Sequence, residues 1–444
     1  MGSDRKAALH EPAVPRSHLE FPLFDSLRGF AALSVLVFHV AGFAVLFGGS
    51  IPWPVEGLAA HLNVGVTFFF VLSAFLLYRP FVAARVSGRD RPAFSGYAKR
   101  RFLRIAPAYW AALTVTAIVP GMSGAFSGNW WVYYGLLQEL PIYTRVGTCA
   151  EISYRCGIPP TWTLAVEVMF YALLPVFVLI LARIGRSRRT RSWLVPELAA
   201  ISVLALVSLP IQSQLPVSGL MHAINYSPFG MGLWFALGLG VASVSVWAED
   251  RISEPGWVGL IRTRPWIPLG IGAGLYVALS LFVLESNPLA NVAFRNVNLY
   301  MVEFVAFGVI ALLVVLPAVF GRQGEGRYRW ILRHPLSTWL GLISYGIFLW
   351  HFPAIILLID IGAPDWWPQM SFAVLLAGTL AITIPCAAVS YYAIERPIMR
   401  WSRRSSIQRP DEGVSPTLEP VTTRAPATPE RDPLLKDQSD PGPP

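Results

Sequence analysis

Two residues of the first apolar segment, an arginine and a histidine, could do chemistry together. Arg28 and His39 lie eleven positions apart in a mostly apolar stretch that runs from Leu23 to Phe47. Eleven residues of α-helix make three turns plus about 20°, so the two side chains share one face and lie about 16 Å apart. A cation and a titratable base are costly inside a membrane-spanning helix, and such residues mark functional sites. The pair therefore predicts a site on this segment.

A second set of cations follows the second apolar run. Arg101 and Arg104 lead into a segment that continues through Pro107. Residues three apart share a helix face, and the guanidinium fork matches phosphate oxygens. Other juxtamembrane arginines serve as topology signals or contact lipid headgroups. We interpret Arg28, Arg101 and Arg104 instead as a site for a phosphate-bearing ligand.

The composition of the chain requires a membrane. Its 444 residues are 54% hydrophobic and 14% charged, whereas soluble domains contain about 25% charged residues. The net charge of +9 is explained by basic cytoplasmic loops beside anionic lipid, and no basic and aromatic pattern indicates nucleic acid. No Cys and His spacing is typical of a metal site. We expect an all-α, polytopic integral membrane protein with about ten transmembrane helices.

Three regions follow from this pattern. Residues 1–22 lack the features of a signal peptide and form an N-terminal cytoplasmic segment. Residues 23–400 form the transmembrane domain, and residues 401–444, rich in Pro, Ser and Thr, form a disordered cytoplasmic tail. Ten apolar runs approach the ~20 residues that a helix needs to cross hydrocarbon. They are Leu23 to Phe47, Ala59 to Tyr78, Ile105 to Val119, Thr161 to Ala182, Leu194 to Ile211, Phe229 to Trp247, Trp266 to Leu284, Leu299 to Phe320, Leu336 to Ile359 and Ser371 to Ala393.

Basic residues alternate between the connecting loops. The loops after the second, fourth, sixth and eighth runs are rich in Lys and Arg, whereas the others hold only Arg145, Arg155 and Arg295. Basic loops stay in the cytoplasm. We therefore expect a multi-pass protein of the plasma membrane with both termini in the cytoplasm.

This topology places three titratable residues at one depth. His39, Glu167 and His351 lie six to eight residues from the outer ends of their runs, which is about 9 to 12 Å at ~1.5 Å per residue. A histidine is the usual general base for a hydroxyl, and a carboxylate can fix its tautomer. We predict that His39 and Glu167 are catalytic, with His351, Ser344 and Tyr345 in the same chamber. Ser344 could orient His351 or only pack, and a covalent intermediate on the histidine is an alternative to general-base catalysis.

The three cysteines have different expected roles. Cys149 and Cys156 lie in an outer loop, where disulfides persist. They form a bridge or remain two free thiols. Cys386 is expected to be a small packing residue.

Six short blocks occur between Phe24 and Arg400. They are Leu27–Gly29 with His39, Phe68–Leu77, Arg100–Trp110, Trp162–Tyr171, Ser344–His351 and Tyr392–Pro397. In this order and spacing they resemble the membrane acyltransferase-3 family. The chain departs from the family at Val168, where many members have a second acid, and at Ala74, where they have glycine.

The resemblance implies an O-acyltransferase that moves an acyl group, commonly acetyl, from cytoplasmic acyl-CoA to a hydroxyl of a glycan, lipid or secondary metabolite. The family's catalytic histidine falls on His39, and its donor-linked arginine falls on Arg28. Its Arg-x-x-Arg element falls on Arg101 and Arg104, and its span-four glutamate falls on Glu167. Acyl-CoA is then a substrate, and no tightly bound cofactor is expected.

Two other classes of function stay open. In a proton-coupled transporter or flippase, the intramembrane His and Glu residues would relay protons and the arginines would attract an anionic solute. A membrane scaffold would use the Pro-rich tail to bind partners. Both alternatives predict no consumption of a thioester, so thiol release from acetyl-CoA separates them from an acyltransferase.

Overall fold

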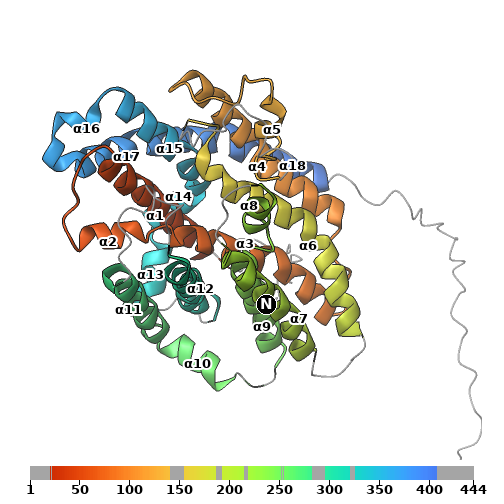
Figure 1. Ribbon diagram of the computed structural model, residues 1–444. Coiled ribbons are helices and arrows are strands. Elements are labelled where there is room, and N and C mark those ends of the chain that lie inside the picture. The colour runs from red at the N-terminus through yellow and green to blue at the C-terminus, as the bar shows by residue number, and fades with distance from the viewer. Residues whose placement is uncertain are drawn as a thin grey trace, which may run out of the picture. The chain divides into compact units, whose positions relative to one another are not determined.

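All ten predicted apolar runs fall on helices in the computed structural model (Figure 1). The structure describes residue 21 and residues 23–140, 155–186, 193–214, 219–251, 253, 255–282, 296–320 and 326–407. Apart from one isolated β-bridge, these residues form only helices and irregular connections. The elements are α1 (Leu23–Leu46), α2 (Val55–Ala60), α3 (Val64–Val86), α4 (Phe94–Ile118), α5 (Trp130–Tyr134), η1 (Pro159–Thr161), α6 (Trp162–Arg186), α7 (Leu194–Gln212), α8 (Gly219–Asn225), α9 (Gly232–Glu249), α10 (Gly256–Thr263), α11 (Trp266–Phe282), α12 (Val297–Val319), α13 (Arg327–Arg333), α14 (Pro335–Leu342), α15 (Ser344–Asp360), α16 (Ala363–Trp366), η3 (Pro368–Met370), α17 (Ser371–Ser390), η4 (Tyr391–Glu395) and α18 (Arg396–Ile407).

The described residues contain fewer complete spans than the ten predicted runs. Seven helices are long and apolar enough to cross a membrane, and the number is nine if each bent pair forms one span. One pair is α10 with α11, bent by 75°, and the other is α14 with α15, bent by 68°. The remaining run lies in α4, whose first half carries the basic residues Lys99 to Arg104. The chain is therefore an all-helical, multi-pass membrane protein.

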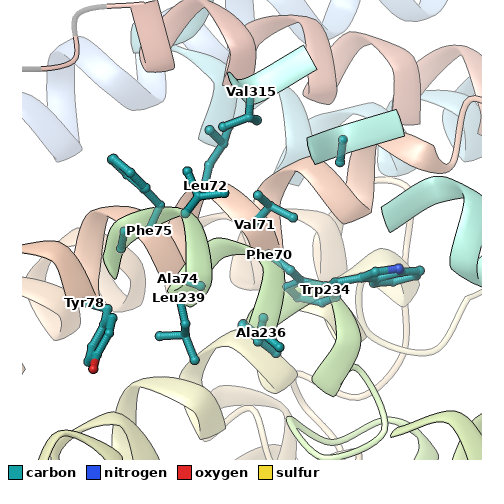
Figure 2. Packing of buried hydrophobic residues seen from close by; sticks show 14 of the residues in the cluster. Phe70, Val71, Leu72, Ala74, Phe75, Tyr78, Trp234, Ala236, Leu239 and Val315 are labelled. Carbon is teal, nitrogen blue, oxygen red and sulfur yellow. The ribbon is translucent and has the colours of Figure 1, made fainter. Parts of the chain in front are cut away.

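The largest apolar core lies where α3 packs against α9 (Figure 2). The ring of Phe70 lies 4.9 Å from that of Phe235 and 6.0 Å from that of Trp234, between ring centroids. Gly238 brings the two backbones close together, since a Cβ there would lie 2.3 Å from the carbonyl oxygen of Val71. Small residues at such contacts are the usual way for membrane helices to pack, because lipid supplies no hydrophobic drive between them.

The first helix, α1, packs against α3, α14, α15 and α17. Its crossing with α14 is a backbone contact, because a Cβ on Gly341 would lie 2.2 Å from the carbonyl oxygen of Asp25. A Cβ on Gly29 would lie 2.8 Å from the backbone nitrogen of Gly341. Ser26 also donates a hydrogen bond of 2.5 Å to the carbonyl oxygen of Leu332 in α13. This close crossing brings the second half of α1 alongside α15.

The segment before α6 is tied to the helices by its last described residues. Arg155 forms an ion pair with Asp360 at the end of α15. Cys156 takes part in the β-bridge with Ser123 and is disulfide-bonded. Cys149 lies outside the described residues, so the pairing of Cys149 with Cys156 stays a prediction. Cys386 is a free thiol in α17, as expected of a packing residue.

The two predicted terminal segments lie mainly outside the described residues. Of residues 1–22, only Phe21 is described. At the other end, α18 continues to Ile407, which includes the first residues of the predicted tail, and residues 408–444 are outside the described range. The disorder of these segments stays a prediction.

Candidate active site

One pocket gathers six of the eight predicted catalytic, donor-binding and chamber residues. It is an open pocket between α1, α3, α4, α6 and α15, with about 690 Å³ of empty space when the part that opens to solvent is included. Predicted residues Arg28, Arg101, Arg104, Glu167, Ser344 and Tyr345 line it, and His39 and His351 do not. The full lining is Arg28, Phe69, Phe70, Ser73, Arg101, Arg104, Ile105, Thr163, Leu164, Glu167, Tyr171, Ser344, Tyr345 and Phe348.

Three arginines converge on this pocket from two helices. Arg28 comes from α1, and Arg101 and Arg104 come from one face of α4. The Nε atom of Arg101 is buried without a hydrogen-bond partner, and its guanidinium lies 5.9 Å from the ring centroid of Tyr171. Arg104 donates only a weak hydrogen bond, 3.4 Å long, to the sulfur of Met399. Within the described residues, none of the three arginines forms an ion pair with an acid.

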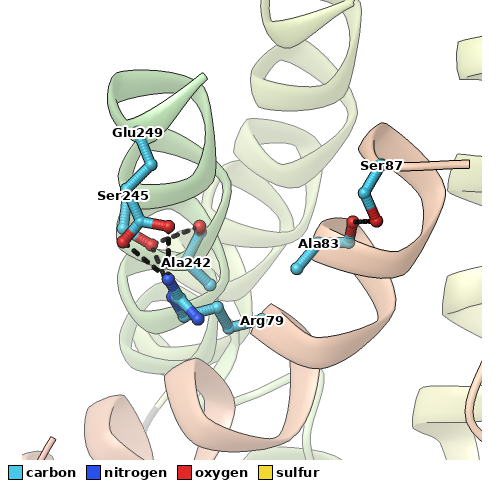
Figure 3. Close-up of polar contacts among 6 residues, drawn as sticks. All are labelled: Arg79, Ala83, Ser87, Ala242, Ser245 and Glu249. Atoms are coloured by element: carbon cyan, nitrogen blue, oxygen red, sulfur yellow. Dashed lines mark hydrogen bonds and ion pairs between the residues drawn. The ribbon is translucent and has the colours of Figure 1, made fainter. Parts of the chain in front are cut away.

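Two arginines of α3 are paired with acids, in contrast to those of the pocket. Figure 3 shows Arg79 of α3 donating to Ser245 and to both carboxylate oxygens of Glu249, at 3.2 Å and 2.6 Å. Arg85 likewise pairs with the buried Glu197. Arg28, Arg101 and Arg104 are half-buried, and removing a guanidinium from water without a directly paired acid is costly. Three such arginines around one cavity are therefore suited to an anionic ligand.

Glu167 is the acidic residue that lines the pocket, and it is hydrogen-bonded to two other residues of the pocket lining. Its Oε1 atom accepts hydrogen bonds from the hydroxyl groups of Ser73 and Tyr171. Among the described contacts, Glu167 has no hydrogen bond or ion pair with His39. No direct contact therefore lets Glu167 fix the tautomer of His39, because Glu167 faces the arginine pocket whereas His39 faces α15, and the catalytic role of Glu167 stays a prediction.

The partner of His39 is His351. The Nδ1 atom of His39 lies 2.9 Å from the carbonyl oxygen of Val35 and 3.3 Å from the Nε2 atom of His351. The Nδ1 atom of His351 lies 3.2 Å from the carbonyl oxygen of Ile347. His351 is fully buried, and the two imidazole rings lie 5.1 Å apart between centroids. His39 and His351, which the sequence predicted to lie at the same depth in the membrane, are therefore in contact.

These contacts fix the neutral tautomers of both rings. A carbonyl oxygen can only accept, so each Nδ1 atom that faces one carries the proton. His39 then donates from Nδ1 to Val35 and to the lone pair on Nε2 of His351. The Nε2 atom of His39 is left with a free lone pair and no hydrogen-bond partner among the described residues. This atom can act as a base, and the imidazolium formed would keep both acceptors at Nδ1.

The two remaining predicted residues connect helices. Ser344 donates to the carbonyl oxygen of Gly341 at 2.8 Å, so it ties the start of α15 to the last turn of α14 and has no hydrogen bond with His351. Tyr345 donates to the carbonyl oxygen of Ile105 at 2.9 Å, which ties α15 to α4. Both side chains line the pocket and hold its walls together.

Three residues of this region were not singled out from the sequence. Tyr171 lies one turn after Glu167, and that spacing could have revealed it. Ser73 is a hydroxyl inside an otherwise apolar block. Glu395 lies in the π-helical turn η4, a type of turn that is frequent at functional sites. It is 2% exposed, both its carboxylate oxygens lack a hydrogen-bond partner, and the nearby charge acting on it is Arg104.

The fold and the site define a class of protein. It is a multi-pass, all-helical membrane protein in which an arginine-lined pocket lies next to a buried histidine pair. The sequence profile of the acyltransferase-3 family, described as an acyltransferase domain, matches residues 22–391. The chain belongs to this family.

Comparison with known proteins gives distant relatives. YrhL of Bacillus subtilis is 26% identical over 415 residues, which cover 88% of this chain and 57% of YrhL. The peptidoglycan O-acetyltransferase OatA of Listeria monocytogenes is 23% identical over 401 residues, or 85% of this chain and 56% of OatA. The acyltransferase MdmB of Streptomyces mycarofaciens is 24% identical over 427 residues, or 93% of this chain and 99% of MdmB. The chain thus spans little more than half of the first two relatives, and no solved structure matches it.

Proposed function

We propose that this chain is an O-acyltransferase that moves an acyl group from acyl-CoA to a hydroxyl group of an acceptor across the membrane. The observation that carries the proposal is the set of three arginines without acidic partners around one pocket. Membership of an acyltransferase family supports the reaction class. The buried histidine pair next to the pocket supplies a base.

The donor binds through its phosphates. Acyl-CoA carries a diphosphate and a ribose phosphate, and guanidinium groups bind such oxygens through paired, charge-assisted hydrogen bonds. Arg28, Arg101 and Arg104 hold these groups. The distance of about 16 Å between Arg28 and His39 along α1 is comparable to the reach of the pantetheine arm. The thioester therefore points from the arginines towards the histidine pair.

The chemistry requires a group that first takes a proton from the hydroxyl as a base and then returns it to the leaving thiolate as an acid. The Nε2 atom of His39 takes the proton from the acceptor hydroxyl as the oxygen attacks the thioester carbonyl carbon. The carbon–sulfur bond then breaks, and the leaving thiolate takes the proton back from His39 to give free CoA. His351 accepts from Nδ1 of His39 and stabilises the imidazolium between the two steps. Glu167, held by Ser73 and Tyr171, balances part of the positive charge of the arginines.

The side of the membrane follows from the charge pattern of the loops. Basic loops in the cytoplasm put both termini there, in the plasma membrane, with the arginine pocket open to cytoplasmic acyl-CoA. The acceptor then enters from the outer side. OatA carries the name of a peptidoglycan O-acetyltransferase, so we propose an acetyl donor and a glycan as the first acceptor class to test, ahead of lipids and secondary metabolites.

The decisive experiment measures thiol release from acetyl-CoA by the purified full chain with a glycan acceptor, together with transfer of labelled acetyl. His39→Gln should lower both signals at least about 100-fold, since general-base catalysis contributes 10²–10⁴. His61→Gln is a matched control, because the Nδ1 atom of His61, like that of His39, faces a carbonyl oxygen four residues earlier, at 2.9 Å, but the ring of His61 packs on Phe307 and not on His351. It should keep full activity. Wild-type protein that releases no thiol would overturn the proposal in favour of a transporter, and full activity in His39→Gln would refute the role of His39 as the base.

A further inference from the structure

Two phenylalanine rings lie where the pocket approaches the histidine pair. Phe69 of α3 and Phe348 of α15 both line the pocket, with ring centroids 6.1 Å apart at 66°. The ring of Phe348 also lies 6.0 Å from the ring of His351, between centroids. Neither His351 nor His39 lines the pocket. Phe348 is thus in contact with the arginine pocket on one side and with the histidine pair on the other.

The position of Phe348 follows from the helix that carries it. Phe348 and His351 are three residues apart on α15 and share a face. Phe348 is 6% exposed, and Tyr345, three residues earlier, lines the same pocket and is held against α4 by its hydrogen bond to Ile105. Phe69 comes from the facing helix α3. This end of the pocket is therefore an apolar wall of two rings, opposite in character to the arginines.

A donor bound through its phosphates presents its other end to this wall. That end is the acyl group, the apolar part of the molecule. Space between the thioester and the two rings decides how many methylenes fit there. Reaction with a hydroxyl that His39 deprotonates also requires the Phe348 ring to turn aside, because that ring separates the pocket from His351.

We propose that Phe348, together with Phe69, is the residue that determines acyl-chain length and that gates passage from the donor pocket to the histidine pair. The inference rests on the proposed function, and it adds a specificity-determining residue to it. With both rings present the pocket accepts short acyl groups. Removing the Phe348 ring extends the pocket towards His351 and admits longer chains.

The chain offers a matched control on the same helix. Phe352 lies one turn after Phe348, is 4% exposed and contacts both histidines, with ring centroids 5.4 Å from His39 and 6.4 Å from His351. Phe352 does not line the pocket. A change that merely loosens the histidines should therefore appear in Phe352→Ala as well as in Phe348→Ala. A change in chain length should appear only in Phe348→Ala.

The experiment compares kcat/KM for acetyl-CoA, butyryl-CoA and hexanoyl-CoA in wild-type protein, Phe348→Ala and Phe352→Ala. One methylene in an apolar pocket changes specificity by about 10- to 200-fold, so Phe348→Ala should raise the ratio of butyryl to acetyl transfer at least about tenfold. Phe352→Ala should keep the wild-type ratio. An unchanged ratio in Phe348→Ala, or the same shift in both variants, would refute the role of Phe348.

A more conservative variant provides a second test in case Phe348→Ala does not fold. Phe348→Leu keeps an apolar side chain and should give a smaller shift in the same direction. If Phe348→Ala does not fold, an unchanged butyryl-to-acetyl ratio in Phe348→Leu refutes the inference. Wild-type protein that transfers no acyl group from any acyl-CoA refutes the proposed function and this inference together. Active wild-type protein with an unaltered profile in the variants refutes this inference alone.

Discussion

Replacement of His351 by phenylalanine tests whether the histidine pair works as one unit. Phenylalanine keeps an aromatic ring of similar size in a fully buried site, but it cannot accept the hydrogen bond from Nδ1 of His39. His39 itself, its bond to Val35 and the arginine pocket all remain. We expect His351→Phe to lower kcat while the KM for the acyl donor stays unchanged.

The size of the effect follows from the charge that develops on His39. A hydrogen bond to a charged group contributes about 1.5–3 kcal/mol, and each 1.36 kcal/mol of barrier is a factor of ten in rate. Loss of the bond at 3.3 Å between the two imidazoles should therefore slow the reaction about 10- to 100-fold. The carbonyl of Val35, at 2.9 Å, keeps part of the stabilisation, so the loss stays smaller than for His39→Gln.

Steady-state thiol release at saturating acceptor, over a series of acetyl-CoA concentrations, separates kcat from KM. His351→Gln supplies the comparison, since its amide oxygen can accept from Nδ1 and should restore part of the rate. A kcat within twofold of wild type in His351→Phe would refute the role given to His351. A loss that appears only in the donor KM would show that His351 belongs to donor binding instead.

Two further predictions concern the arginines and the helix crossing. Arg101→Ala should raise the KM for acyl-CoA about 10- to 100-fold with little change in kcat, because one charge-assisted hydrogen bond contributes about 1.5–3 kcal/mol. An unchanged KM for acyl-CoA would exclude Arg101 from the phosphate site. Gly341→Ala should destabilise the fold by about 1–3 kcal/mol, as overpacking does, because the new Cβ would lie 2.2 Å from the backbone oxygen of Asp25. Thermal unfolding in detergent measures this change, and Gly259→Ala, inside α10 where a Cβ meets nothing within 4 Å, should leave the midpoint unchanged or raise it, because Ala is the better helix former.

The position of each helix in the chain could be read from the sequence because the signal is local. A helix that crosses hydrocarbon satisfies its own backbone hydrogen bonds and needs about 20 apolar residues. The exceptions have physical causes in the chain itself. The basic residues of α4, from Lys99 to Arg104, interrupt its apolar character, and the bend of 68° divides one other run into α14 and α15. The run that begins at Trp266 forms α11, which has only 17 residues and follows α10 after a bend of 75°. The predicted ten spans therefore compare with seven to nine in the described residues.

The sequence also predicted which residues of a single helix share a face. Helical periodicity alone put Arg101 and Arg104 on a common face, and both line the pocket. It also gave Arg28 and His39 a common face of α1, although Arg28 lines the pocket and His39 pairs with His351. The pitch of a single helix fixes such relations, and they hold whatever surrounds it.

Which helices become neighbours was decided by tertiary structure alone. Many residues lie at the same depth in the membrane. Depth alone therefore could not predict that His39 contacts His351 or that Glu167 contacts Ser73. Side chains in lipid gain little by burial against each other, and helix contacts depend instead on close backbone approach at small residues. The crossing at Gly29 and Gly341 is such a contact. It brings α1 to α15, and with that packing the histidine pair forms.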